Sequence, residues 1–323
     1  PHPQAVTLLD IMDKTLTPMG GRMLNRWMVM VLKDIQKIQE RHKVVDYFLK
    51  NDDKREFLRE KLKSLGDIER NAAKVSTGKI TPKQLQILAE GLKVITEIKN
   101  DLQDETSIQF LIQNLNDWKE VSNHLLNTLS EDPPHQIIKG NVIAEGVSEE
   151  LDQLRNLQNK GKDYLEELRK RESDRTGIPN IKVSFNNVFG YYIEVRNTHK
   201  DKVPEDWIRK QTLVSAERYI TEELKEYENQ ILGAEEKILN LETQLFHELI
   251  QSLFTHLKSI QKSAITVAQL DVLSSFAQLA IENHYVHPQS NDSLNLIIED
   301  GRHPVIEKQL RPEDPYIANS VSL

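Results

Sequence analysis

The sequence predicts a mainly α-helical fold, a long helical lever bundle with a small antiparallel β module inserted between two long coiled helices. Only twelve glycines and twelve prolines occur in 323 residues, which favours helices. Apolar residues beyond position 222 recur at spacings of three and four, as in a coiled helix. Between two such helices the apolar residues alternate with a period of two, which is typical of β-strands.

Residues 1–177 are expected to form the first part of the helical bundle. The helical pattern is interrupted near residues 51–53, 66, 78–82 and 100–104, where Gly, Pro, Asn and Asp gather. From Ser148 to about Arg171 a further helix is expected, because its leucines form one apolar stripe. These leucines are Leu151, Leu154, Leu157, Leu165 and Leu168.

Residues 178–221 are the predicted β insertion. Residues 181–186 and 191–196 alternate around a turn-like segment at 186–190, and residues 207–220 are expected to supply a third and a fourth strand. The insertion contains seven basic and five acidic residues, which gives it a charge of +2 in a chain of net charge -8. A locally basic module on a long arm is suited to hold a phosphate backbone. Its six aromatic residues are more typical of a small sheet core than of base stacking.

Residues 222–290 are expected to complete the lever. With Thr221 as N-cap and Glu222 and Glu223 in the first turn, one helix from 222 to about 260 is predicted, roughly 58 Å long. Its spacing then changes to steps of four at Leu249, Leu253 and Leu257, which relaxes a supercoil. We expect it to pair antiparallel with the helix after Ser148. The predicted seam consists of Leu224, Tyr227, Ile231, Ala234, Ile238, Leu241 and Leu245.

Residues 291–323 do not continue the helical pattern of apolar residues. Leu294–Ile298 is strand-like and residues 301–304 are turn-like, so we expect the truncated start of another domain here. The first residue is not Met, and we expect the chain to be a fragment.

Composition limits the class of protein. With 38% hydrophobic and 28% charged residues, a soluble protein without membrane association is expected. The absence of cysteine excludes disulfides and thiolate metal sites and fits a cytoplasmic protein. Because the net charge is -8, any affinity for nucleic acid has to be local.

No pattern in the sequence supports catalysis or a metal site. Gly-Lys occurs at 78–79 and at 161–162, but a phosphate-binding loop needs an earlier Gly and a following Ser or Thr, and neither is present. His247-Glu248 begins a zinc-protease pattern, yet Gln251 stands where the second His is required. We therefore expect no catalytic residues, no metal and no cofactor in this chain, and no enzyme activity of its own.

Several motifs follow one another along nearly all 323 residues. They are Leu8–Asp10, Thr15–Trp27, Asp67–Arg70 followed by Gly78 and Pro82, Thr176–Ile178, Val188–Val195, Arg209–Leu213, Glu217–Thr221, Leu270–Leu273 and Gly301–Val305. Together they resemble the MutS family of DNA mismatch repair proteins, most closely in the β insertion. Val31 is a departure, where that family often has Pro.

The resemblance implies a role for each region. Residues 1–177 and 222–290 would be the core and lever, 178–221 a clamp on double-stranded DNA, and 291–323 the start of an ATPase domain. The clamp residues implied are Lys200, Lys202, Arg209, Lys210, Gln211, Thr212 and Ser215. Tyr316, Ile317 and Asn319 would belong to an ATP adenine site that is incomplete here.

The full-length protein is implied to be a homodimeric ATPase of the bacterial cytoplasm, associated with the nucleoid. It would use ATP and magnesium, bind mismatched heteroduplex DNA and engage a downstream MutL-type repair protein. In this chain the lever would couple the ATPase state to a non-specific grip on the duplex backbone. Two alternatives stay open: a helical arm that binds protein rather than DNA, and a MutS-like recombination paralogue.

Overall fold

The computed structural model describes residues 6–186, 190–311 and 315–323, without the side chains of 160–163 and 230–232. The chain divides into two compact units. The first comprises Pro1–Asn127 and Ile250–Leu323, and the second comprises Thr128–Leu249. The predicted mainly helical fold with a small antiparallel β insertion is confirmed. The turn expected around 187–189 lies outside the described residues.

The first unit is built from short and medium helices, and the four predicted interruptions are present, whereas the breaks after Met12, Val29 and Ile112 were not predicted. Thr17, Asp34 and Thr81 accept backbone N–H bonds as N-caps, which satisfies donors that a helix start leaves free. The helices before residue 129 are α1 (Leu8–Met12), α2 (Pro18–Val29), α3 (Ile35–Lys50), α4 (Asp52–Lys63), α5 (Ile68–Ser76), α6 (Pro82–Leu102), the 3-10 helix η1 (Thr106–Ile108), α7 (Gln109–Ile112) and α8 (Lys119–Thr128).

Helix α11 (Leu257–Asn283) forms the centre of this unit, and α2, α3 and α5 pack around it. Between Glu222 and Asn283 one window of 18 residues is long and apolar enough to cross a membrane, but 67% of it is buried inside the protein. A core helix that is apolar on all sides has the same composition, and the packing of α11 accounts for its apolar character.

A buried carboxylate fixes the start of α2 to α11. Asp271 is fully buried and accepts hydrogen bonds from the backbone N–H of Leu16 (3.0 Å), the backbone N–H of Thr17 (2.8 Å) and the Thr17 hydroxyl (2.7 Å). The Thr17 Oγ1 in turn accepts the N–H of Gly20. A Cβ at Gly20 would collide with the Asp271 carboxylate, so the close approach of α2 requires glycine there.

The C-terminal residues of the first unit form a small sheet and a short helix. Strand β5 (Ile297–Gly301) pairs antiparallel with β6 (Asn319–Ser322), and α12 (Pro304–Gln309) lies between them in sequence. The predicted strand 294–298 thus begins at Ile297, although Leu296 already exchanges backbone hydrogen bonds with Leu323.

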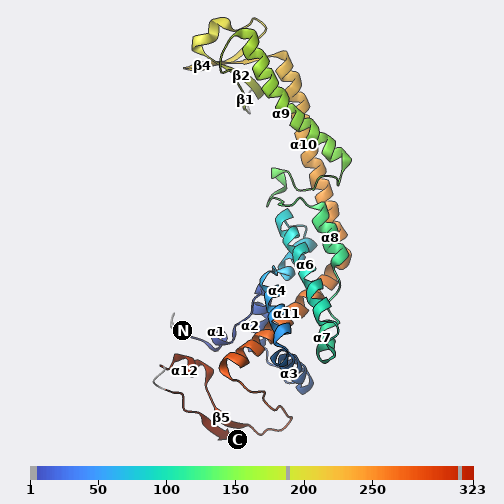
Figure 1. Cartoon of the computed structure of the whole chain (residues 1–323), viewed down its shortest axis with the longest axis vertical. Coiled ribbons are helices and arrows are strands. Elements are labelled where there is room, and N and C mark those ends of the chain that lie inside the picture. The colour runs from blue at the N-terminus through green and yellow to red at the C-terminus, as the bar shows by residue number, and fades with distance from the viewer. Residues whose placement is uncertain (1–5, 187–189, 312–314) are drawn as a thin grey trace. The chain divides into compact units, whose positions relative to one another are not determined.

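The second unit contains the two long helices α9 (Glu149–Thr176) and α10 (Glu222–Ser252), which run antiparallel as predicted (Figure 1). Contacts made by successively later residues of α9 are with successively earlier residues of α10. Gln158 donates to Glu235 at 3.1 Å, Tyr164 stacks on Tyr227 with ring centroids 5.0 Å apart, and Arg171 pairs with Glu223 at 2.5 Å.

The buried stripe of α10 follows the predicted seam only in its first half. Leu224, Tyr227, Ala234 and Ile238 are buried, while the side chain of Ile231 lies outside those described. Beyond them Leu241 and Leu245 are only half-buried, and Glu242 and Phe246 are buried instead. A straight α-helix drifts relative to a strict heptad repeat, which explains the shift.

The prediction of one helix to about 260 is wrong. Helix α10 ends at Ser252, the 3-10 helix η4 (Phe254–His256) follows, and α11 begins at Leu257. The break falls where the apolar spacing changes to steps of four, and the chain there tightens into bonds from Leu253 N–H to the Ile250 carbonyl and from His256 N–H to the Leu253 carbonyl.

A segment between α8 and α9 forms hydrogen bonds with an ion pair that joins the two long helices. The segment contains the 3-10 helix η2 (Ile137–Lys139) and a bridge between Leu129 and Ile143. Arg155 of α9 donates to Glu242 of α10 at 2.5 Å and to the carbonyl of Ile143 at 2.7 Å. Glu242 has a fully buried side chain and also accepts the N–H of Val142.

The β insertion is a four-stranded antiparallel sheet. Strands β1 (Lys182–Asn186), β2 (Gly190–Arg196), β3 (Ile208–Thr212) and β4 (Ala216–Ile220) have the order β1-β2-β4-β3. The 3-10 helix η3 (Asn197–Lys202) joins β2 to β3 in sequence. The sheet core includes the helical residues Leu168 and Leu224, together with Ile178, Ile181, Ile193, Val195, Trp207 and Tyr219.

Candidate nucleic-acid interface

The aromatic residues of the insertion mostly form its core. Tyr192, Trp207 and Tyr219 are buried and Tyr191 is half-buried, whereas Phe185 is 44% exposed. Phe189 lies outside the described residues. Since stacking on bases needs an accessible ring face, candidate contacts with nucleic acid come from the polar and basic side chains.

Arg218 organises the face of the sheet that points away from the Ile193 core. It bonds the Glu194 carboxylate at 3.0 Å and the Gln211 amide oxygen at 2.9 Å, and its guanidinium carbon lies 4.4 Å from the Tyr192 ring centroid. The register pairs Glu194 with Arg218 and Gln211 with Arg218, so these residues form one row across β2, β4 and β3. The Gln211 side chain is therefore held by a hydrogen bond from Arg218 within the same sheet.

The opposite side of β3 and the turn beyond it carry most of the other implied residues. Arg209 pairs with Glu217 at 3.3 Å, and Thr212 lies opposite Glu217 in the register. The Tyr219 hydroxyl, then Arg209 and Lys200, hold the pKa of Glu217 below its usual value. Lys200 is thus close enough to Glu217 to belong to the same group.

The turn between β3 and β4 is held against the start of η3. Leu213 N–H bonds the Ala216 carbonyl at 2.8 Å, Asn197 N–H bonds the Ser215 carbonyl at 3.1 Å, and the Asn197 amide bonds the Val214 carbonyl at 3.0 Å. These bonds fix Ser215 beside the basic residues. Lys210, at the register shift between Arg209 and Gln211, is exposed, and within the described part of the chain its amino group has no hydrogen bond or ion pair.

Five of the seven implied clamp residues are therefore close together in the structure, and we call them the turn cluster: Lys200, Arg209, Lys210, Thr212 and Ser215. Gln211 faces the other side of the sheet. Lys202 donates to the carbonyl of Gly177 at 3.2 Å, at the end of α9, so it also stands apart.

Two basic residues of the insertion were not among the implied clamp residues. Lys182 pairs in register with Glu194, and Arg196 pairs with Ala216, so both lie on the Arg218 side of the sheet. Both side chains are exposed. The period-two alternation of residues 181–186 and 191–196 carried this signal, because it places them on the face that does not contain Val183 and Ile193.

The residues implied for an adenine site lie at β6. Tyr316 is half-buried, Ile317 is 80% exposed, and the Asn319 amide donates to the Ile317 carbonyl at 3.2 Å. The sequence has no phosphate-binding loop, so the residues present here do not by themselves fit ATP. Among the described residues no group of three or more His, Cys, Asp or Glu side chains is arranged to hold a metal ion.

Comparison with known proteins covers the whole chain. The model of the family MutS domain III matches residues 2–277. The chain is 52% identical over 324 residues to the DNA mismatch repair protein MutS of Flavobacterium johnsoniae, with 100% of this chain and 37% of that protein covered.

Two further relatives carry the same name. Identity is 53% over 324 residues for Flavobacterium psychrophilum, with 100% of this chain and 37% of the relative covered. It is 51% over 322 residues for Parabacteroides distasonis, with 99% and 37% covered. The chain spans 37% of the length of these relatives. It belongs to the MutS family of DNA mismatch repair proteins.

Proposed function

We propose that the β insertion grips the sugar-phosphate backbone of duplex DNA without reading sequence, and that the turn cluster supplies the grip. The observation that carries this proposal is that basic side chains in the described part of the insertion remain unpaired after some of its acidic residues have formed ion pairs within the protein. Glu194 is paired with Arg218, Glu217 with Arg209, and Asp206 with Arg175. Lys200 and Lys210 of the turn cluster remain exposed, with no ion pair inside the described part of the chain, and so do Lys182 and Arg196 on the Arg218 side of the sheet.

Such an arrangement suits phosphates better than bases. Lysine and arginine side chains with small polar neighbours are the usual donors to phosphate oxygens, and the turn cluster has both kinds. Binding of this kind is independent of sequence and strongly dependent on salt.

We further propose that α9 and α10 are the lever that carries this grip. Their antiparallel pairing, the stacked Tyr164 and Tyr227 and the buried Arg155–Glu242 pair support a stiff connection. A stiff two-helix arm can transmit a change at one end to the other. In the full-length protein that change would come from the ATPase whose state the lever is proposed to couple to DNA.

Charge reversal of Lys210 tests the proposal. In the full-length protein, Lys210→Glu is expected to weaken binding to a perfectly paired duplex and to a mismatched duplex by similar factors, about fivefold to tenfold, because a phosphate contact carries no base information. Fluorescence anisotropy with both duplexes at fixed salt gives the two factors.

Lys237 provides the matched control, since it is exposed on α10 and Lys237→Glu makes the same change of charge. It should leave both affinities nearly unchanged. Full affinity of a folded Lys210→Glu protein at low salt would place the grip elsewhere. Val214, whose side chain is fully exposed at the tip of the turn, is the feature that favours a protein partner, and loss of duplex binding on Lys210→Glu would argue against that alternative.

A further inference from the structure

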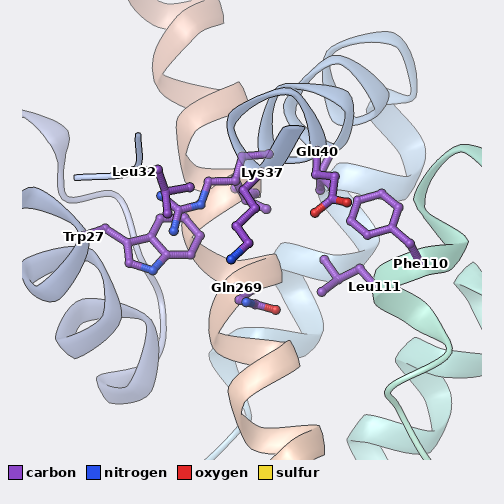
Figure 2. A pocket seen from close by; sticks show the side chains of 10 residues that line it. Trp27, Leu32, Lys37, Glu40, Phe110, Leu111 and Gln269 are labelled. Carbon is purple, nitrogen blue, oxygen red and sulfur yellow. The ribbon is translucent and has the colours of Figure 1, made fainter. Parts of the chain in front are cut away.

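A pocket in the first unit, which we call the Trp27 pocket, lies between α2, α3, α7 and α11. Its volume is about 180 Å³. Since a single water needs about 10–15 Å³, the pocket admits a group of several atoms. Figure 2 shows Trp27 on one side, Phe110 and Leu111 on the other, and the amino group of Lys37 directed towards Gln269 between them.

Arg41 is the unusual residue of this pocket. Its guanidinium carbon lies 3.3 Å from the centroid of the Trp27 ring, and the side chain is half-buried. Burial lowers the pKa of Arg41, and no acidic residue counteracts it. In the described part of the chain its five N–H donors have no hydrogen-bond acceptor. A guanidinium that is stacked on an aromatic ring and whose N–H donors have no acceptor is well placed to bind a carboxylate through two parallel hydrogen bonds.

The surrounding charges also favour an anion. Lys37 lies one turn before Arg41 on α3, and both line the pocket. The acid of the pocket, Glu40, lies beside Phe110 on the far side (Figure 2). Within the segment 22–41, Arg22 is paired with Asp67 and Glu69, and the other four basic residues against two acids leave a charge of +2 in a chain of -8. Its positive field is local and complements an acidic group.

An apolar surface leads directly into the pocket. Val29, Met30 and Val31 are 84%, 60% and 75% exposed, and the next residue, Leu32, lines the pocket. We call these three residues the apolar ledge. Three consecutive exposed hydrophobic residues are unfavourable unless another molecule covers them. A free small carboxylate filling the pocket would leave the ledge in water, whereas a polypeptide segment would cover it.

We propose that the Trp27 pocket and the apolar ledge together dock a segment of a partner protein that carries one Asp or Glu side chain between apolar residues. The carboxylate enters the pocket and accepts hydrogen bonds from the Arg41 guanidinium. Lys37 and the Gln269 amide lie beside it. The flanking apolar side chains pack on Val29, Met30 and Val31.

Fluorine NMR of the chain labelled with fluorotryptophan tests this. The chain has three tryptophans, and Trp118 and Trp207 are only 2% and 5% exposed, so their signals are internal controls. The probe is the blocked peptide acetyl-Ser-Leu-Asp-Leu-Val-Ser-amide, compared with its twin that has Asn for Asp. Only the Trp27 signal should shift, and the Asn twin should bind about tenfold more weakly, as expected for a lost charge-assisted pair.

Variants separate the two parts of the site. Arg41→Gln should reduce peptide affinity about tenfold, while Arg26→Gln, an equal loss of charge at a residue that does not line the pocket, should reduce it less than about twofold. Should Arg41→Gln fail to fold, Lys37→Gln and the exposed Met30→Ser serve in its place, and each should weaken the peptide severalfold.

Three results would overturn the proposal. The first is a Trp27 signal that does not respond to millimolar peptide, or that responds equally to the Asn twin. The second is free butyrate binding as tightly as the peptide, which would assign the pocket to a small carboxylate. The third is self-association of the chain that Met30→Ser abolishes, which would assign the ledge to a second copy.

Discussion

Replacing Asp271 with Ala is expected to lower the free energy of unfolding of the first unit by about 3–5 kcal/mol. The substitution leaves the N–H groups of Leu16 and Thr17 and the Thr17 hydroxyl without their acceptor at a buried site. Each buried unsatisfied donor costs roughly 1–3 kcal/mol. Urea unfolding followed by tryptophan fluorescence gives the value, because Trp118 bonds Ser263 of α11 and is buried in the same unit.

The control is Asp104→Ala, at an exposed aspartate, which should change stability by less than about 0.5 kcal/mol. Adjacent glycines of α2 give a second comparison. Gly20→Ala should be strongly destabilising because its Cβ meets the Asp271 carboxylate, whereas the Cβ of Gly21→Ala meets nothing closer than 3.5 Å. Equal stability of the two glycine variants would show that α2 does not approach Asp271 this closely.

The effect of Asp271→Ala should also depend on pH. Burial raises the pKa of Asp271 above 3.8, against the hydrogen bonds from Thr17 and Leu16 and the charge of Arg59, which lower it. A carboxyl whose pKa is raised by folding contributes most stability below its unfolded pKa and loses it as pH rises through the folded pKa. The destabilisation by Asp271→Ala should therefore be larger near pH 4 than at pH 7.

Glu242→Ala is expected to destabilise the second unit by about 3–5 kcal/mol, because it leaves Arg155, whose side chain is only 16% exposed, without its carboxylate. Arg155 would keep the Ile143 carbonyl and a 3.7 Å contact with Asp152. Hydrogen exchange of the 142–155 backbone should rise along with the loss of stability, since Val142 N–H also bonds Glu242.

A double variant distinguishes the cost of the unpaired charge from the cost of the lost hydrogen bonds. Arg155→Met with Glu242→Leu replaces both charges by apolar side chains, and a buried ion pair replaced in this way often keeps most of its stability. The double variant should recover at least about 2 kcal/mol of the loss caused by Glu242→Ala. A double variant as unstable as the single one would mean that the cost does not arise from the unpaired Arg155 but from the hydrogen bonds that Glu242 accepted, such as that from the Val142 N–H.

Local patterns predicted most of the elements. The cap at Thr221, whose hydroxyl accepts the Leu224 N–H, the antiparallel pairing of α9 with α10 and the four strands of the insertion all followed from spacing and residue type. The heptad pattern failed beyond Ile238, where Glu242 and Phe246 take the buried positions. The sequence around Glu242 does not indicate that this carboxylate will be buried, because its partner Arg155 lies on another helix.

Interactions across the sheet and between distant segments could not be predicted from the sequence. Gln211 faces Arg218 because the register shifts between Arg209 and Gln211, and a bulge of this kind has no signature in a short strand. Asp271 and Thr17 are 254 positions apart, so no local pattern connects them. Arg41 and Trp27 belong to separate helices, and their stacking depends on how α2 and α3 pack on α11.

The salt dependence of duplex binding tests the proposed backbone grip most directly. Affinity of the full-length protein for a perfectly paired duplex is measured between about 50 and 200 mM salt, and log affinity is plotted against log salt. Lys210→Glu should reduce the magnitude of the slope by about 0.9 or more, the value for one lost phosphate contact, while Lys237→Glu leaves it unchanged. An unchanged slope for Lys210→Glu in a folded protein would contradict a phosphate contact at the turn cluster.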